Sequence, residues 1–316
     1  MRSHLATTTS GPSPGAPWSV ARCPGHHGEL LQGAFVRGSA PLLRALVTLP
    51  FPNVGAVASV RLLPGAPVVE VVPRWKQKAA RAARLTLDEL DLAAGCQLVL
   101  ESRLPSGWGL GSSTADVVAT IRAVLRAAGR RVSPALVARL AVAAEGASDS
   151  LMFSEWVTLF AQREGRILEV LGHRLPPLTV VGCNPSGAAC VDTLQHPLPD
   201  YSAAELRQFR ELLALLRGAV RAQSVREIGR VATASACINQ RFLPTHRFAE
   251  LEAIGRRHGA QGIQVSHSGT VAGLLFDACQ EGVAQRVREC RAGLEAEGFP
   301  PTWRFRADTG GRSSPR

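Results

Sequence analysis

A glycine-rich turn followed by three hydroxyl residues is the part of this chain best suited to bind an anion. The segment runs Pro-Ser-Gly-Trp-Gly-Leu-Gly-Ser-Ser-Thr-Ala over residues 105–115. Gly107, Gly109 and Gly111 can adopt positive φ, and they carry no side chain that would keep a ligand away. A helix that begins at Ser112 would turn its free N–H groups and positive dipole end outward. The pattern therefore predicts a phosphate-binding loop.

A pair of carboxylates follows a predicted helix further along the chain. Glu145 and Asp149 would lie one turn apart on one face if helical geometry continued between them. Such a pair can bind Mg²⁺ through one oxygen ligand and accept a substrate proton through the other. A solvated helix end is the alternative interpretation.

Two more segments combine turn-forming residues with polar side chains. Residues 21–33 contain Cys-Pro-Gly, two adjacent histidines and Glu29. A β-turn is the plain alternative, and His26 and His27 make a poor metal pair because neighbours on a strand point to opposite faces. Residues 264–271 predict a strand, a hydroxyl-rich turn and a second strand, which could bind another anionic group or form a simple hairpin.

The elements around these segments predict how they are held. Residues 97–104 alternate as a half-buried strand does, and residues 117–125 carry an apolar stripe at helical spacing. The chain lacks the Gly-Lys-Ser/Thr ending of the common phosphate loop after its glycines. A helix over residues 75–90 bears four basic side chains, for which a solvated face is the favoured interpretation. Ser202 with Glu205, and Ser224 with Glu227, predict two capped helix starts.

Composition sets the broad class. At 316 residues the chain suits two domains, and strands mix with helices without strict βαβ repetition, which favours an α+β fold. The net charge of +11 suits an anionic partner, although an arginine-rich composition is also typical of a GC-rich genome. Seven scattered cysteines without a Cys-x-x-Cys pair favour reduced thiols in a cytoplasm over disulfides or zinc. We expect no signal peptide, no membrane span and no membrane partner.

Taken in order, these segments resemble the motifs of the GHMP kinase family, which includes galactokinase, homoserine kinase and mevalonate kinase. Residues 23–29 resemble its first motif, residues 105–115 its second, and residues 266–273 its third. The second motif is the family's ATP-phosphate loop. The resemblance extends over about residues 21–308.

Within the family, three stretches look most like the L-threonine kinases of cobalamin biosynthesis, at residues 23–33, 148–153 and 268–274. This resemblance implies ATP, Mg²⁺ and a small hydroxylated acceptor, here L-threonine giving O-phospho-L-threonine for the aminopropanol arm of cobalamin. A GHMP kinase for homoserine or another small alcohol is the alternative. A nucleic-acid-binding protein and a catalytically inactive protein of this fold are less favoured, and a homodimer stays open.

The resemblance also implies a fold with two α+β domains and the active site between them. An N-terminal ribosomal-protein-like domain is expected over residues 21–165, and a C-terminal ferredoxin-like domain over residues 166–309. Residues 1–20 and 310–316 are expected to be disordered.

The resemblance also implies roles for individual residues, according to their positions in the motifs. ATP would be held by Pro105, Gly107, Trp108, Gly109, Leu110, Gly111, Ser112, Ser113, Thr114 and Ala115. Ser112 or Ser113, together with Glu145, would bind Mg²⁺. Ser112, Glu145 and Asp149 form the expected catalytic set, with Asp149 taking the hydroxyl proton. The acceptor would meet Glu29, Asp192, His267, Ser268 and Gly269.

Three positions depart from the family pattern. Trp108 stands where many relatives carry lysine or a small residue, and we expect its ring to pack near the nucleotide base or ribose. The adjacent histidines replace small residues in the first motif. His267 and Ser268 replace part of a glycine cluster in the third.

Overall fold

A computed structural model describes residues 17–36, 41–187, 199–267 and 269–307. The strands within them form one sheet. They are β1 (Ser19–Phe35), β2 (Leu43–Pro64), β3 (Val69–Val72), β4 (Ala94–Ser102), β5 (Val157–Ala161), β6 (Arg166–Gly172), β7 (Leu178–Cys183), β8 (Gly262–Val265), β9 (Ala272–Asp277) and β10 (Thr302–Ala307). The helices are α1 (Gln77–Glu89), α2 (Ser112–Ala127), α3 (Pro134–Glu145), α4 (Ala203–Arg221), α5 (Val225–Asn239), α6 (Phe248–Arg257) and α7 (Val283–Ala296), with a 3₁₀ turn at Leu151–Phe153.

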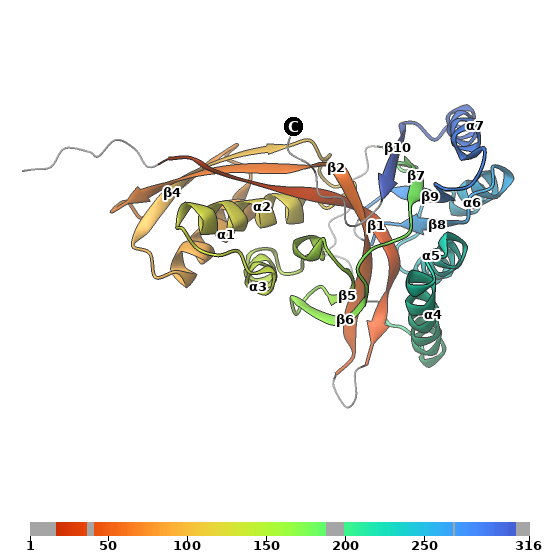
Figure 1. Ribbon diagram of the computed structural model, residues 1–316, viewed down its shortest axis with the longest axis horizontal. Helices are drawn as coiled ribbons and strands as arrows, with labels where there is room; N and C mark the ends of the chain where they lie inside the picture. The colour runs from red at the N-terminus through yellow and green to blue at the C-terminus, as the bar shows by residue number, and fades with distance from the viewer. Residues whose placement is uncertain (1–16, 37–40, 188–198, 268, 308–316) are drawn as a thin grey trace, which may run out of the picture.

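Two long antiparallel strands, β1 and β2, join the two halves of the molecule (Figure 1). The sheet order is β10-β7-β9-β8-β1-β2-β4-β3, and β5 and β6 branch from β2. In Figure 1, α1, α2 and α3 lie along one side of the β1, β2 and β4 end, and α4–α7 lie at the opposite end. The mixed α+β class predicted from the sequence is confirmed.

β1 differs from one sequence-based expectation and excludes one alternative interpretation. Residues 19 and 20 were expected to be disordered, but they pair with Val60 and Ser59 of β2, which satisfies their backbone groups. The segment 21–33 is not an isolated turn, because it continues the same strand with register shifts between Pro24 and Gly25 and again before and after Glu29. The bulges bend the strand and re-aim its side chains.

The expected domain boundary after residue 165 falls inside a β-hairpin. β5 and β6 pair antiparallel, from Val157 opposite Gly172 to Ala161 opposite Arg166. The hairpin therefore ties residues 166–172 to the first half of the chain. The expected disordered ends, residues 1–16 and 310–316, lie outside the described residues.

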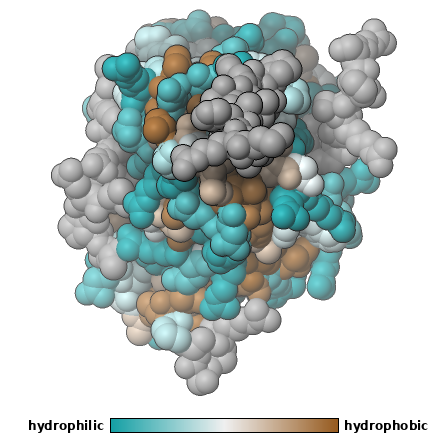
Figure 2. All heavy atoms as spheres, turned by 90° about the vertical axis from the view of Figure 1, so that its left-hand side faces the viewer, coloured by the Kyte–Doolittle hydropathy of each residue, from teal (hydrophilic) through white to brown (hydrophobic). Residues whose placement is uncertain are grey.

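Polar and apolar side chains alternate over the visible surface of the molecule. Figure 2 shows hydrophilic and hydrophobic residues intermingled on the face at the left of Figure 1. Among the described residues, no helix combines the length and apolarity needed to cross a membrane. Six cysteines in this part of the chain carry free thiols.

The predicted cap of α4 is present, with both of its reciprocal hydrogen bonds. Ser202 Oγ accepts a hydrogen bond from the Glu205 amide at 3.2 Å, and Glu205 Oε2 accepts one from the Ser202 amide at 2.7 Å. At α5, Ser224 Oγ accepts from the Glu227 amide at 3.3 Å. Each bond satisfies a backbone donor that the helix itself leaves free.

We expect Ser202→Ala to lower the free energy of unfolding by about 1 kcal/mol, because the Glu205 amide loses its acceptor. Urea unfolding monitored by circular dichroism measures this loss. Ser154→Ala, at an exposed serine that follows the 3₁₀ turn, is the matched control. An unchanged midpoint in Ser202→Ala would show that the cap contributes nothing.

Candidate active site

The glycine-rich segment forms a loop at the start of α2, as the sequence predicts. Gly107, Gly109 and Gly111 have φ of 78°, 77° and 72°, a region that other residues rarely adopt. Gly111 is the N-cap of α2, and among the described residues no side chain caps the first turn. The N–H groups of that turn are therefore available to an anion.

The turn between β8 and β9 supports this loop from behind. The carbonyl of Trp108 accepts hydrogen bonds from the amides of Thr270 and Val271 at 3.2 and 3.3 Å, and Ser266 Oγ donates to the carbonyl of Gly109 at 3.1 Å. Gly269 is packed so closely that a Cβ there would lie 2.2 Å from the Gly109 nitrogen. The glycine-rich segment 105–115 and the segment 264–271 thus meet in space.

A cavity of about 410 Å³ lies beside the loop, between the first turns of α1 and α2. Its lining includes Trp75, Lys76, Lys78, Gly107 and Ser113. Two helix N-termini and Lys78 bring positive charge to this hollow, whereas the charge of Lys76 is balanced by Asp116, which also lines it. The sequence favoured a solvated face for the basic residues of this helix. Lys78 is exposed, in agreement with that interpretation, and it also lines the cavity.

Trp108 is placed differently from Trp75. Its ring stacks on Trp303 of β10, with ring centroids 6.0 Å apart, and it does not belong to the cavity lining. Trp75 is 65% exposed, and the Lys76 Nζ lies over its ring, 4.2 Å from the centroid. The tryptophan that lines the cavity is therefore Trp75, which lies outside the predicted motifs. Lys76 is also ion-paired with Asp116 of α2.

The two predicted carboxylates meet at the hydroxyl of Thr114. Its Oγ1 lies 2.9 Å from Glu145 Oε1 and 3.3 Å from Asp149 Oδ2. Helical geometry does not continue to Asp149, because α3 ends at Glu145, where the sequence predicted its end, and Gly146 takes a φ of 83°. The loop that follows nevertheless brings Asp149 back beside Glu145.

The carboxylate of Glu145 and a neighbouring hydroxyl form a set of oxygen atoms that can act as metal ligands. Ser113 Oγ donates to Glu145 Oε2 at 2.7 Å, so Ser113 rather than Ser112 supplies the hydroxyl nearest this carboxylate. The two residues differ by one step around the helix, about 100°, which turns their side chains apart. Burial raises the pKa of Glu145 to about 7, and the negative charge of Asp149 acts in the same direction. A carboxylate and a hydroxyl are the donor types that Mg²⁺ prefers, so this set fits that ion.

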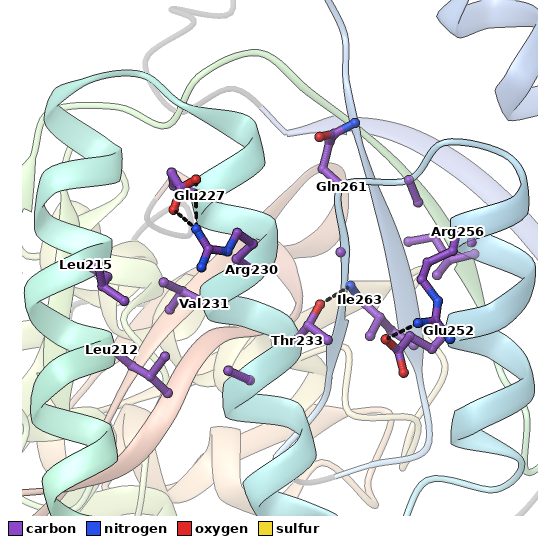
Figure 3. Close-up of a pocket in the computed structure, with 15 residues that line it drawn as sticks. Leu212, Leu215, Glu227, Arg230, Val231, Thr233, Glu252, Arg256, Gln261 and Ile263 are labelled. Carbon is purple, nitrogen blue, oxygen red and sulfur yellow. Dashed lines mark hydrogen bonds and ion pairs between the residues drawn. The ribbon is translucent and has the colours of Figure 1, made fainter.

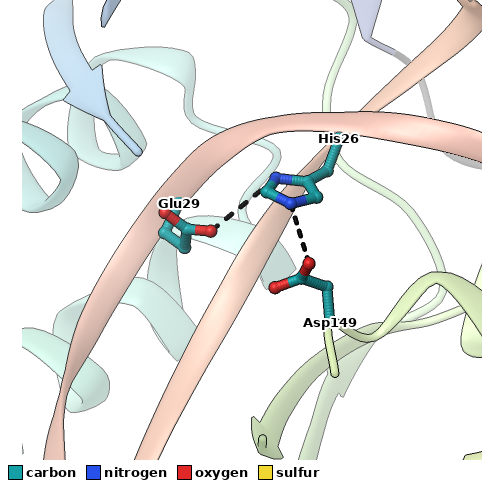
Figure 4. Close-up of side chains that lie close together, drawn as sticks. All are labelled: His26, Glu29 and Asp149. Carbon is teal, nitrogen blue, oxygen red and sulfur yellow. Dashed lines mark ion pairs between the residues drawn. The ribbon is translucent and has the colours of Figure 1, made fainter. Parts of the chain in front are cut away.

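His26 is the main contact of Asp149. Its Nε2 lies 2.9 Å from Asp149 Oδ2 (Figure 4). The Gly28 amide donates to its Nδ1 at 3.1 Å. In the neutral ring, this backbone bond leaves the proton on Nε2, facing Asp149. In the charged ring both nitrogens carry protons, so Nδ1 can no longer accept from the Gly28 amide. Burial alone lowers the pKa of His26, but the carboxylates of Asp149 and Glu29 outweigh it and raise the pKa to about 9. Burial works against ionisation of Asp149, yet the positive charge of His26 holds the pKa of that carboxyl below its usual range.

A second imidazole–carboxylate pair lies beside the first. Glu29 Oε2 accepts from the His267 backbone amide at 2.8 Å, and Glu29 Oε1 lies 2.8 Å from His267 Nδ1. His267 Nδ1 is also 4.0 Å from Asp149 Oδ1. The sequence proposed Glu29 and His267 separately as acceptor contacts, and the structure joins them into one unit.

The side chains of His26, Glu29 and Asp149 come close enough together to suggest a metal ion, since their ligand atoms lie within 4.8 Å of one another. Each of them already has a partner, however. His26 Nε2 faces Asp149, and both Glu29 oxygens face His267. We therefore interpret this group as a network of ion pairs.

His27 points away from His26, as expected for adjacent strand residues. It is fully buried among Phe51, Trp303 and Phe305, and its Nδ1 contacts the Gln264 amide nitrogen. Burial lowers its pKa to about 3, so the ring is neutral. Of the expected acceptor residues, Asp192 and Ser268 lie outside the described residues.

A second hollow of about 420 Å³ lies between α4, α5, α6 and β8 (Figure 3). Its floor is apolar, with Leu212, Val231 and Ile263. Its charged rim residues pair within their own helices, Arg230 with Glu227 at 2.8 Å and Arg256 with Glu252 at 3.8 Å. The described residues that line it include no glycine-rich loop and no pair of carboxylates sharing a hydroxyl.

Comparison with known proteins agrees with this placement. The family model described as GHMP kinases N terminal domain matches residues 77–154, which contain the loop, Glu145 and Asp149. The chain is 27% identical over 272 residues to the L-threonine kinase of Salmonella typhimurium, covering 84% of this chain and 86% of that protein. It is 29% identical over 265 residues to the L-threonine kinase of Citrobacter freundii, covering 82% and 86%.

Solved structures share the fold. A homoserine kinase from Cytophaga hutchinsonii superposes with a TM-score of 0.69 at 15% identity, covering 96% of this chain and 98% of that one. The mevalonate kinase of Methanococcus jannaschii gives a TM-score of 0.57 at 12% identity, covering 95% and 100%. At these identities the likeness establishes the architecture alone.

The His26–Asp149 contact makes a pH-dependent prediction. Because the folded pKa of about 9 lies above the ordinary 6.5, the charged ring stabilises the fold fully below pH 6.5, and this stabilisation is lost as pH rises through 9. In Asp149→Asn the loss should begin at lower pH, since the main charge that raises the pKa is gone. Histidine NMR titration and urea unfolding across this range measure both effects. The same His26 pKa in both proteins would contradict the assigned contact.

Proposed function

We propose that this chain, a member of the GHMP kinases, transfers the terminal phosphoryl group of ATP to the hydroxyl of L-threonine. The single observation that carries the proposal is the meeting at Thr114: the phosphate loop, Glu145 and Asp149 converge on one hydroxyl at the start of α2. Relatives named L-threonine kinase match over more than four-fifths of the chain. Their acceptor is therefore the first to be tested here.

The nucleotide is assigned to the cavity beside the loop. Its phosphates would lie against the amides of residues 107–113, where the first turn of α2 offers free donors. Lys78 lines the same cavity and can neutralise phosphate charge, whereas Lys76 is ion-paired with Asp116. Trp75 offers an exposed ring at its edge, suited to stack on a base.

Glu145 and Ser113 are the residues that would hold Mg²⁺, with Ser112 beside them at the cavity wall. A bound Mg²⁺ supplies positive charge that offsets the charge spread over the transferred oxygens. The protein's own part is to aim the loop amides and the carboxylates before the reaction begins.

Asp149 is assigned to the acceptor hydroxyl. Among the described residues its Oδ2 is occupied by His26 and Thr114, so Oδ1 is the oxygen that can accept the hydroxyl hydrogen bond. In transfer, the hydroxyl oxygen bonds to the γ-phosphorus, the bond from phosphorus to ADP breaks, and the hydroxyl proton moves to Oδ1. A carboxyl with a lowered pKa is a weak base, which suits a proton released late.

The proposed setting is the cytoplasm and the supply of the aminopropanol arm of cobalamin. Free thiols at the six described cysteines are compatible with a reducing compartment. O-phospho-L-threonine would be the product delivered to that pathway.

The acceptor assignment is tested by incubating the protein with ATP, Mg²⁺ and a panel of small amino acids and alcohols. We expect saturable ADP release with L-threonine and O-phospho-L-threonine as the product by mass spectrometry. Turnover of homoserine without threonine would replace the acceptor while keeping the kinase. No turnover of any acceptor, with no ATP binding, would overturn the function itself.

We expect Asp149→Asn to reduce kcat by at least about 10²-fold with little change in the KM for ATP, because the carboxylate acts mainly on the acceptor in the transition state. Steady-state kinetics at saturating L-threonine measure this. Asp277→Asn, at the end of β9, is the matched control and should retain full activity. An active Asp149→Asn would reduce Asp149 to a structural role.

A further inference from the structure

We propose that His267, held by Glu29, binds the carboxylate of the acceptor and so restricts this kinase to amino acid acceptors over the corresponding amino alcohols. The inference rests on the proposed function and specifies which side chain recognises the acceptor. In this arrangement Asp149 contacts the acceptor hydroxyl. Glu29 is a positioning residue that acts through the imidazole.

Glu29 fixes the imidazole at two points. One carboxylate oxygen accepts from the His267 backbone amide and the other faces its Nδ1, each at 2.8 Å. The Glu29 side chain is 0% exposed, and its backbone pairs with Val265 of β8. With both oxygens engaged and no access to solvent, Glu29 is not available to an acceptor ammonium group.

The side chain of His267 is the most exposed of this cluster. The side chains of His267 and Asp149 are 13% and 9% exposed, whereas those of His26 and Glu29 are 0% exposed. The nitrogen Nδ1 of His267 lies 4.0 Å from Asp149 Oδ1. An acceptor whose hydroxyl meets Oδ1 therefore has the imidazole next to it. In a 2-amino-3-hydroxy acid, three bonds join the hydroxyl oxygen to the carboxyl carbon, a span short enough to reach both groups.

The charge of the ring suits an anion. Burial lowers the pKa of His267, but Glu29 and Asp149, which face it from β1 and from the loop after α3, outweigh burial and the positive His26 and raise the pKa. A charged ring donates one N–H to Glu29 and keeps Nε2–H as a donor for a ligand. Such a ring has no lone pair with which to act as a base. Carboxylate binding therefore fits it better than proton abstraction.

The test compares L-threonine with 1-amino-2-propanol of the same carbinol configuration, which lacks only the carboxylate. For the wild type we expect a strong preference for threonine in kcat/KM. In His267→Gln, the KM for threonine should rise about 10- to 100-fold, the range of one charge-assisted hydrogen bond, with kcat little changed and no effect on 1-amino-2-propanol. His246→Gln, at an exposed histidine, is the matched control and should behave as wild type.

Two further measurements separate recognition from folding. Equilibrium binding of L-threonine in the presence of a non-hydrolysable ATP analogue should weaken in His267→Gln while the thermal unfolding midpoint stays close to wild type. The KM for threonine should rise at alkaline pH as the ring loses its charge, and at lower pH in Glu29→Gln, which lacks the carboxylate that raises the pKa. If His267→Gln does not fold, the pH dependence and Glu29→Gln carry the test.

Each outcome has a distinct meaning. Wild-type protein that turns over neither acceptor overturns the proposed function. Wild-type activity on threonine with an unchanged threonine preference in His267→Gln overturns the assignment of His267 alone. An equal loss with both acceptors also overturns it, since that result would place the imidazole in the chemical step.

Discussion

The burial of three carboxylates in one small volume is the constraint on which the rest of this structure depends. Glu29, Glu145 and Asp149 are 2%, 7% and 6% exposed. Buried charges of like sign are tolerated only when partners compensate them. Here two imidazoles and two hydroxyls do so: His26 faces Asp149, His267 faces Glu29, and Ser113 and Thr114 bind Glu145. The bulged course of β1 and the start of α2 both serve to bring these partners together.

The sequence predicted the elements that local rules control. The glycine loop, the start of α2 at Ser112 and the capped start of α4 all follow from φ requirements, dipole and capping chemistry, which act over a few residues. The mixed α+β class followed from the order of strands and helices. Glu145 and Asp149 were singled out together, although the helical spacing that first linked them ends at Gly146.

The features that local sequence patterns did not predict depend on contacts between residues far apart in the chain. Nothing near Lys76 or Lys78 in the chain indicates that α1 begins at the loop cavity, since the packing of α1 against α2 decides it. The adjacent histidines looked incidental because their partners, Asp149 and Gln264, are more than a hundred residues away. The continuity of β1 through residues 21–33 likewise rests on its pairing with β2, which a local pattern of turn formers conceals.

The contact between Gly269 and the glycine-rich loop closes one flank of that loop. Backbone atoms of the β8–β9 turn lie against Trp108 and Gly109 with no room for even a methyl group between them. That flank of the loop is therefore closed, and the cavity that Gly107 and Ser113 line lies at the first turns of α1 and α2. A nucleotide bound there, as proposed, would meet solvent beside Trp75, whose ring is 65% exposed.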